Sequence, residues 1–297
     1  DSFGAGVDRG RLATADGRSI DAGTRYGDVK TVDVEDYAVL FELDRLRAKL
    51  RGERASLPRR YDALVLDESQ ELAPLELRLL GRAVAQGGTL VVAGDAGQQV
   101  DVTACFTDWQ TSMRDLGAAS HTKVTLATNY RCHPTVTALA RHVLDPASPA
   151  PPFTDDGPIG FLPCANECHL AARLIDGLRE LVVDDPRASI AVVARTPESA
   201  RRVASWLRRG VDVRLALEGD FHFGPGIQVT AVREVKGLEF DHVVIPDAST
   251  AAYPEGGEGR RALYVAVTRA AHRVVFATTG RWTELLGDAS PQRASSV

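Results

Sequence analysis

The sequence is short of lysine and of long apolar runs. Only four of its 35 basic residues are lysine, and none of these four follows a glycine. The phosphate-binding loop G-x-x-x-x-G-K-[ST] is therefore absent from these 297 residues, the glycine-rich start included. No apolar stretch approaches the roughly 20 residues that a membrane-spanning helix requires, so we expect no contact with a membrane.

Cysteine content and net charge restrict the compartment and the surface. The four cysteines, Cys105, Cys132, Cys164 and Cys168, are too few for a disulfide framework in a chain of 297 residues. We therefore expect reduced thiols and a cytoplasmic protein. The net charge of −5 argues against a uniformly basic nucleic-acid coat, although it leaves room for a local basic groove. The start at Asp1 and the preference for arginine indicate a piece of a longer bacterial protein.

Helical and strand-like periods alternate along the chain. Residues 1–32 show no period and are expected to be loop, and the proline-rich residues 145–157 are expected to be a linker. Because fully apolar strands alternate with helices, we expect an α/β fold whose parallel sheets are covered by helices on both faces. The expected helices lie near 35–51, with Asp33 or Glu35 as cap, and at 74–86, 134–144, 170–183, 197–209 and 261–271. The expected strands are 63–66, 89–93, 124–126, 190–194, 211–215, 227–231, 242–245 and 273–276.

Two carboxylates follow the first expected strand. Asp67 and Glu68 come directly after Leu64-Val65-Leu66, and in open parallel sheets the chemistry lies at the carboxyl ends of strands. At such a place Asp67 can hold Mg²⁺ through water while Glu68 orients or deprotonates an attacking water. The alternative is a capped turn, in which Asp67 or Ser69 starts the next helix.

The second expected strand runs into a polar turn, Gly94-Asp95-Ala96-Gly97-Gln98. Its position after a buried strand makes the Gln98 amide a candidate to sense the γ-phosphate of a nucleotide. The alternative is an ordinary β-turn.

Five motifs, in this order within residues 61–278, resemble those of superfamily 1 helicases of the UvrD/Rep type. Asp67-Glu68-Ser69-Gln70 resembles the Walker B motif, and Gly94 to Gln98 resembles the GDxxQ motif. The others are Asn129-Tyr130-Arg131, the KGLEF motif in 235–241 and the arginine-finger motif in 258–270. Each motif is weak alone, but five in the family's order are specific. The resemblance implies two RecA-like lobes, residues 1–128 and 129–297, the first of them incomplete.

The same resemblance implies ATP and Mg²⁺ as cofactors and suggests the catalytic residues. Asp67 and Glu68 handle Mg²⁺ and the attacking water, and Gln98 senses the γ-phosphate. Arg131 and Arg269 stabilise the transferring phosphoryl group, because a guanidinium stays charged and can grip phosphate oxygens with two parallel hydrogen bonds.

Adenosine and nucleic acid are expected to contact other residues of these motifs. By resemblance, Tyr130 stacks on adenine, Glu239 contacts the ribose, and Gly237 belongs to the same nucleotide-binding motif. Trp109 is expected to stack on a base of single-stranded nucleic acid, and Arg233 to contact a phosphate. Core positions are the alternatives for Tyr130 and Trp109.

Three features depart from the family pattern. The Walker A loop is absent, so we expect it on a missing N-terminal segment or on a separate chain. Arg233 stands where the family usually has histidine, three residues before the KGLEF lysine. Only residues 216–226 are available for the duplex-engaging insertion, so we expect no large accessory subdomain.

The sequence therefore predicts an ATP-dependent helicase or translocase that moves 3′ to 5′ on single-stranded DNA, with RNA as another possible substrate. The isolated chain is expected to be inactive without its phosphate-binding loop. Its compact form also resembles HelD-like factors. The alternative is a motor-derived binding module that docks on RNA polymerase or a repair complex and does not hydrolyse ATP by itself.

Overall fold

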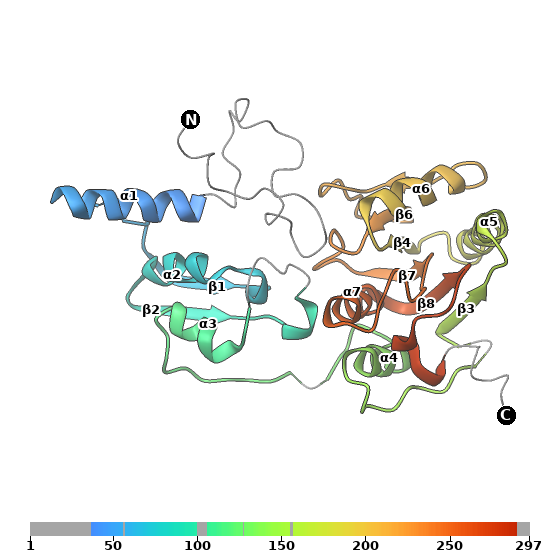
Figure 1. The fold of residues 1–297 in the computed structure, drawn as a ribbon, viewed down its shortest axis with the longest axis horizontal. Coiled ribbons are helices and arrows are strands. Elements are labelled where there is room, and N and C mark those ends of the chain that lie inside the picture. The colour runs from blue at the N-terminus through green and yellow to red at the C-terminus, as the bar shows by residue number, and fades with distance from the viewer. Residues whose placement is uncertain (1–36, 56, 100–105, 127, 155–156, 290–297) are drawn as a thin grey trace, which may run out of the picture. The chain divides into compact units, whose positions relative to one another are not determined.

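The structure, a computed structural model, describes residues 37–55, 57–99, 106–126, 128–154 and 157–289. The chain divides into two compact units, Asp1–Lys123 and Val124–Val297, which we call unit 1 and unit 2 (Figure 1). This division lies a few residues before the predicted boundary after residue 128. The loop expected at 1–32, the helix cap expected at Asp33 or Glu35, and Cys105 lie outside the described residues.

Unit 1 is built on two parallel strands. β1 (Tyr61–Leu66) pairs with β2 (Val84–Val92), with Leu64 opposite Leu90. The helices are α1 (Tyr37–Arg51), α2 (Pro74–Arg82) and α3 (Trp109–Asp115), and the short 3₁₀ turns η3 (Ser69–Glu71) and η4 (Ala96–Gln98) follow the strands. Both predicted strands are present. β2 begins at Val84, earlier than expected, so residues 84–86 belong to the strand and not to the helix expected at 74–86, which ends at Arg82.

Helices cover one face of this small sheet. Leu66 of β1 packs in a buried cluster with Leu77 of α2 and Met113 of α3. Side chains alternate across a strand, and Val65 therefore points away from this cluster, as does its register partner Val91. Val65 is 68% exposed and Val91 is 48% exposed. Within the described residues of unit 1, the predicted cover on both faces is thus found on one face only.

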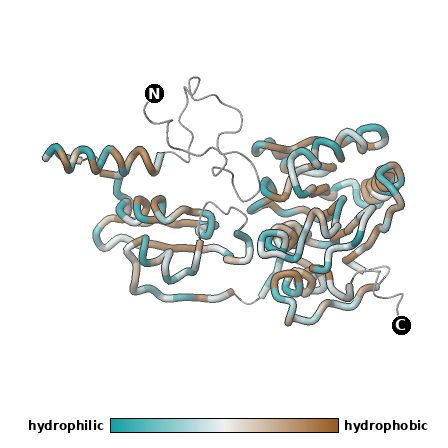
Figure 2. Tube along the Cα trace, viewed as in Figure 1, coloured by the Kyte–Doolittle hydropathy of each residue, from teal (hydrophilic) through white to brown (hydrophobic). Residues whose placement is uncertain are grey.

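Helix α1 has the expected apolar spacing, yet none of its residues is buried. Leu43 and Leu46 are both largely exposed, and Figure 2 shows α1 banded with hydrophobic and hydrophilic residues. An ion pair of 2.8 Å between Glu42 and Arg82 connects α1 to α2. Hydrogen bonds from Arg45 and Arg82 lower the pKa of the Glu42 carboxyl to about 2. Charge therefore contributes to the position of α1 where burial does not.

Unit 2 contains a six-stranded parallel sheet in the order β3-β8-β7-β4-β6-β5. Its strands are β3 (Ile159–Pro163), β4 (Ser189–Ala194), β5 (Arg214–Leu215), β6 (Gly226–Ala231), β7 (Phe240–Ile245) and β8 (Ala270–Thr278). Its helices are α4 (Pro134–Leu144), α5 (Glu167–Asp184), α6 (Pro197–Leu207) and α7 (Gly257–Thr268), and a 3₁₀ segment, η6 (Glu284–Ala289), follows β8.

Helices lie on both faces of the unit 2 sheet (Figure 1). On one face, Leu178 of α5 and Leu207 of α6 pack on Val192 of β4 in a large buried cluster. On the other face, α4 and α7 pack against each other and against β8. The predicted α/β fold with parallel sheets covered by helices is confirmed, most completely in this unit.

Local signals in the sequence explain where the helices of unit 2 begin. The Asn166 side chain accepts a hydrogen bond from the His169 amide at the start of α5, and Thr196 does the same for the Ser199 amide at the start of α6. Both satisfy an amide that the first helical turn leaves without an internal partner. Pro134 occupies the first turn of α4, where a missing N–H costs nothing.

The sequence does not predict β3 and α3, and one predicted strand is wrong. Both β3 and α3 are short, and β3 contains glycine and proline. The apolar residues 124–126 form no strand, and Val124 and Leu126 are 77% and 91% exposed. An apolar run forms a strand only where a neighbouring strand pairs with it and other side chains cover it.

No helix in the described part of the chain is long and apolar enough to cross a membrane.

Candidate functional site

The two acidic residues of the first motif stand at the carboxyl end of β1. Asp67 is exposed and its Oδ1 accepts a hydrogen bond of 2.9 Å from the Glu68 amide. Glu68 has φ 49° and ψ 36°, a left-handed conformation that is uncommon for a residue with a side chain. Such a conformation costs on the order of 1–3 kcal/mol and persists where the surroundings fix it, often at functional sites.

The capped-turn interpretation of this segment holds in part. The 3₁₀ turn η3 begins at Ser69, with Glu68 as its N-cap residue and no side-chain cap, and the Ser69 hydroxyl donates to the Leu66 carbonyl. Helix α2 begins later, at Pro74, and the amide of Ala73 donates to its Glu76 carboxylate. Ser69 therefore starts a short 3₁₀ turn, but neither Asp67 nor Ser69 caps it or α2 with its side chain.

Gln70 connects the two strand ends of unit 1, and sequence reasoning missed it. Its side chain is fully buried. Its Nε2 donates to Glu68 Oε2 at 2.5 Å, and its Oε1 accepts from the Asp95 amide at 3.1 Å. The first and second motifs are therefore in contact through one amide side chain. No sequence pattern indicates this burial.

Gln98 lies in the turn η4 that follows β2. Its Nε2 donates to Asp95 Oδ2 at 3.0 Å, and Asp95 Oδ1 accepts from the Gly97 amide at 2.9 Å. The Gln98 backbone amide also donates to the Asp95 carbonyl at 3.0 Å, as in a β-turn, so the segment is a short 3₁₀ turn capped by Asp95. The bond to Asp95 Oδ2 holds the side chain of Gln98.

Trp109 lies at the start of α3 and is half-buried. Its side chain is therefore neither in the core nor fully exposed. Its ring meets that of Phe106 edge to face, with 5.0 Å between ring centroids. A Cβ atom at Gly94 would lie 2.6 Å from the Trp109 ring, so the end of β2 passes directly beneath it.

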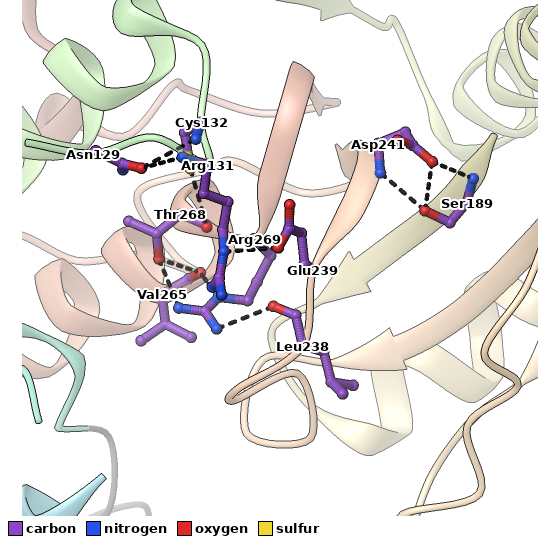
Figure 3. Close-up of polar contacts among 10 residues, drawn as sticks. All are labelled: Asn129, Arg131, Cys132, Ser189, Leu238, Glu239, Asp241, Val265, Thr268 and Arg269. Carbon is purple, nitrogen blue, oxygen red and sulfur yellow. Dashed lines mark hydrogen bonds and ion pairs between the residues drawn. The ribbon is translucent and has the colours of Figure 1, made fainter. Parts of the chain in front are cut away.

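Three predicted site residues of unit 2 come together near the amino ends of β7 and β8 (Figure 3). Arg131 Nε lies 2.7 Å from Glu239 Oε2, although 108 positions separate them, and both side chains are about half exposed. The Asn129 side chain accepts from the amides of Arg131 and Cys132, which shapes the loop before α4. This geometry places a guanidinium and a carboxylate together at the amino-terminal ends of the strands.

Arg269 is buried beside this pair, with 2% of its surface exposed. Its Nε donates to the Val265 carbonyl at 3.2 Å, and one terminal nitrogen donates to the Leu238 carbonyl at 3.1 Å. The other terminal nitrogen donates to the Thr268 hydroxyl at 3.1 Å. The guanidinium therefore connects the end of α7 to the loop that contains Glu239, and its direction is well fixed.

The remaining motif residues have distinct surroundings. Tyr130 is 93% exposed, so the core position considered for it is wrong. Gly237 has φ +69°, and the turn around it is closed by a hydrogen bond from the Leu238 amide to the Val235 carbonyl. Because only glycine adopts this conformation without strain, Gly237 sets the direction in which Glu239 leaves the turn.

Arg233 lies apart from these residues. It is exposed and follows the carboxyl end of β6, whereas Glu239 and Arg269 precede the amino ends of β7 and β8. The strands are parallel, so these residues lie at opposite ends of the strands. Arg233, predicted to contact nucleic acid, is at the carboxyl ends, and the residues predicted to bind the nucleotide are at the amino ends.

Two neighbouring groups have shifted pKa values. Burial raises the pKa of the Cys132 thiol, more than the nearby Asn129 and Arg131 lower it, so the thiol remains neutral. Burial also tends to raise the pKa of the Asp241 carboxyl, but hydrogen bonds from the Ser189 amide and hydroxyl bring it below its usual value. Asp241 thereby ties β7 to β4 and has a structural role.

No cluster of three or more His, Cys, Asp or Glu side chains that could hold a metal ion occurs among the residues that the structure describes. Mg²⁺ in nucleotide sites commonly takes one or two carboxylates, together with water and substrate phosphates. The oxygen atoms of Asp67 and Glu68 are donors of that kind.

Residues 226–277 match the UvrD-like helicase C-terminal domain family. The matched segment begins with β6 and ends within β8, so it contains Gly237, Glu239 and Arg269. It confirms the resemblance to UvrD-like helicases in this part of the chain and indicates a helicase-related protein. No curated protein matches the chain.

The chain is also similar to a solved structure, described as the C-terminal domain of a possible DNA helicase from Lactobacillus plantarum WCFS1. That similarity has 22% sequence identity and a TM-score of 0.45. It covers 56% of this chain and 97% of that one.

Proposed function

We propose that the protein is part of an ATP-dependent translocase of the UvrD/Rep type that moves 3′ to 5′ on single-stranded DNA. The observation that carries this proposal is the gathering of Arg131, Glu239 and Arg269, from three separate motifs, at one edge of the unit 2 sheet. The family match over residues 226–277 supports it, because two of these residues lie in the matched segment.

In this proposal the strand ends of unit 1 perform the chemistry on water. Asp67 and Glu68 hold Mg²⁺, which neutralises charge on the phosphates when bound. Glu68 accepts the proton of the attacking water, and Gln98 contacts the γ-phosphate. Two hydrogen bonds support these roles, because they hold the side chains concerned: Gln70 donates to the Glu68 carboxylate, and Gln98 donates to Asp95.

Unit 2 supplies the positive charge and the adenosine contacts. Arg131 and Arg269 stabilise the charge on the transferring phosphoryl group, and an arginine in this role is worth roughly 10³–10⁵ in rate. The bonds that hold Arg269 reduce the reorganisation needed on reaction. Tyr130, exposed as it is, stacks on adenine, and Glu239 contacts the ribose.

The phosphate-binding loop comes from a polypeptide segment outside the sequence described here. Support for this part of the proposal lies in the described residues of unit 1, among which Val65 and Val91 leave one face of a parallel sheet open. Parallel sheets are almost always covered on both faces. A further segment of the motor lobe would bury these valines and bring the loop close to Asp67.

Exchange of Arg131 for alanine tests the proposal. In the full-length protein, Arg131→Ala should lower the ATPase rate stimulated by single-stranded DNA by about 10²-fold or more. Arg214→Ala is a matched control, because Arg214 has the same 47% exposed side chain and also pairs with a surface carboxylate, that of Asp220. The control should keep the parental rate.

Two results would contradict the proposal. If Arg131→Ala keeps the parental rate of stimulated ATPase, Arg131 does not take part in the reaction. Absence of any ATPase in the unaltered full-length protein would favour the docking module, whose partners would be RNA polymerase or a repair complex.

A further inference from the structure

Gln70 is the fully buried amide that lies between the two motif-bearing strand ends of unit 1. One end of its side chain donates to Glu68 Oε2, and the other accepts from the backbone amide of Asp95. This buried amide makes hydrogen bonds to a carboxylate and to a backbone N–H. Its replacement should lower the stability of the fold, because each partner would lose its hydrogen bond.

The surroundings fix Gln70 more tightly than its two bonds alone. A Cβ atom at Gly94 would lie 2.2 Å from Gln70 Oε1, so this position accommodates only glycine while Gln70 stays in place. The same Cβ atom would lie 2.6 Å from the Trp109 ring, which closes the space above Gly94. Backbone, ring and strand end therefore leave the amide little freedom.

The hydrogen bond from Gln70 acts on a residue, Glu68, whose backbone and carboxylate both need support. Its left-handed backbone is strained, and its carboxylate stands at an open strand end. A general base works only when it is held within hydrogen-bond reach and direction of the water it activates. The donor on Glu68 Oε2 restricts rotation of the carboxylate, whereas no hydrogen bond among the described residues occupies Oε1.

We propose that Gln70 is a positioning residue that aims the Glu68 carboxylate and ties its direction to the GDxxQ strand end at Asp95. This inference rests on the proposed function, which makes Glu68 the base. Gln70 does not touch the substrate. Its loss changes turnover through Glu68 and leaves the affinity for ATP intact.

Gln70→Met in the full-length protein tests the role, because methionine has a similar length and no hydrogen-bonding amide. We expect kcat for stimulated ATP hydrolysis to fall about 10–100-fold with KM for ATP within about twofold of the parent. Gln228→Met is the matched control. Gln228 is also a buried amide with two hydrogen bonds, both to the His222 backbone, and it lies in unit 2.

The control separates positioning from stability. Both variants should lower the melting temperature, but only Gln70→Met should lower kcat. Equal kcat values in the two variants would overturn the proposal. So would a rise in KM that accounts for the whole loss of activity, because Gln70 would then serve binding.

Hydrogen exchange tests the bridge without catalysis, in the 297-residue chain itself. Exchange at the Asp95 amide should accelerate about 10-fold or more in Gln70→Met and remain unchanged in Gln228→Met. Unaltered protection at Asp95 would show that the bridge is absent in solution and would overturn the inference. Glu68→Gln separates the two proposals. If that variant hydrolyses ATP normally, the proposed base is wrong, whereas normal kcat in Gln70→Met alone rejects only the positioning role.

Discussion

Glu68 shows how one residue combines an unfavourable backbone with a defined direction. Its φ of 49° is costly for a glutamate, and the hydrogen bond from Gln70 holds its carboxylate at the end of β1. The Glu68 amide in turn donates to Asp67 Oδ1, so the two acidic side chains are arranged by one strained turn. A side chain fixed in this way suits the proton transfer that we propose for Glu68.

Glu68→Gln removes the basic carboxylate and preserves its size. The amide oxygen of the substituted side chain can still accept the hydrogen bond from Gln70, so the strand end should keep its geometry. In the full-length protein we expect turnover to fall about 10²-fold or more, with ATP still bound, because a general base typically contributes 10²–10⁴ in rate. Steady-state ATPase and equilibrium ATP binding measure the two effects. Glu180→Gln, an exposed carboxylate on α5, should behave as the parent.

Some of these residues could be predicted from the sequence and others could not. Asp67 and Glu68 follow an apolar strand, which is a local signal. The contact between Arg131 and Glu239 joins segments far apart in the chain and depends on the strand order of the sheet. The burial of Gln70 depends on its neighbours Gly94 and Trp109, which lie far along the chain, so no hydrophobic periodicity in the sequence predicts it.

At the scale of elements, apolar runs predicted the strands well where packing and pairing agree with them. The strand expected at 190–194 is β4, which lies inside the sheet and has its core residues fully buried. β3 was missed because it is an edge strand, where Pro163 is tolerated. The apolar residues 124–126 were misread because no neighbouring strand pairs with them.

The starts of β4 and β7 form a pH-sensitive junction between elements. Hydrogen bonds from Ser189 lower the pKa of Asp241, and burial lowers the pKa of His242, which pairs with Ile190 in the sheet. Asp185, His272 and Arg273 also act on the pKa of His242. Protonation of either Asp241 or His242 therefore opposes folding.

The sign of the pH dependence follows from both groups. Below pH 6.5 the unfolded chain binds a proton at His242 that the folded chain resists, so stability falls as pH decreases. Asp241 adds a second loss at more acidic pH, because its contribution is present above its unfolded pKa and disappears through its lowered folded pKa. We expect the melting temperature of the protein to decrease as pH falls below 6.5 and to decrease further below pH 3.8, by roughly 2–4 °C for each kcal/mol lost.

His242→Gln should flatten the part of this curve between pH 6.5 and pH 5. Thermal melts monitored by circular dichroism across that range provide the measurement. An identical slope in the parent and in His242→Gln would show that His242 titrates alike in the folded and unfolded chain.

At the scale of the whole molecule, the two units differ in completeness. Unit 2 has six parallel strands with helices on both faces, whereas the described part of unit 1 has two strands with one face open. The predicted cofactor residues are divided between them, with the carboxylates in unit 1 and the arginines in unit 2. The proposed motor requires both sets of residues for hydrolysis.

The 297-residue chain alone should bind ATP weakly and show almost no steady-state hydrolysis. The reason is chemical: without G-x-x-x-x-G-K-[ST], the backbone amides and the lysine that contact the β- and γ-phosphates are missing, however well Asp67 and Arg131 are placed. A coupled ATPase assay with and without single-stranded DNA measures the rate, and calorimetric titration with ATP measures the affinity. The full-length protein, which we propose contains the loop, is the positive control and should be stimulated by single-stranded DNA. Robust turnover by residues 1–297 would mean that another phosphate-binding element exists within this chain.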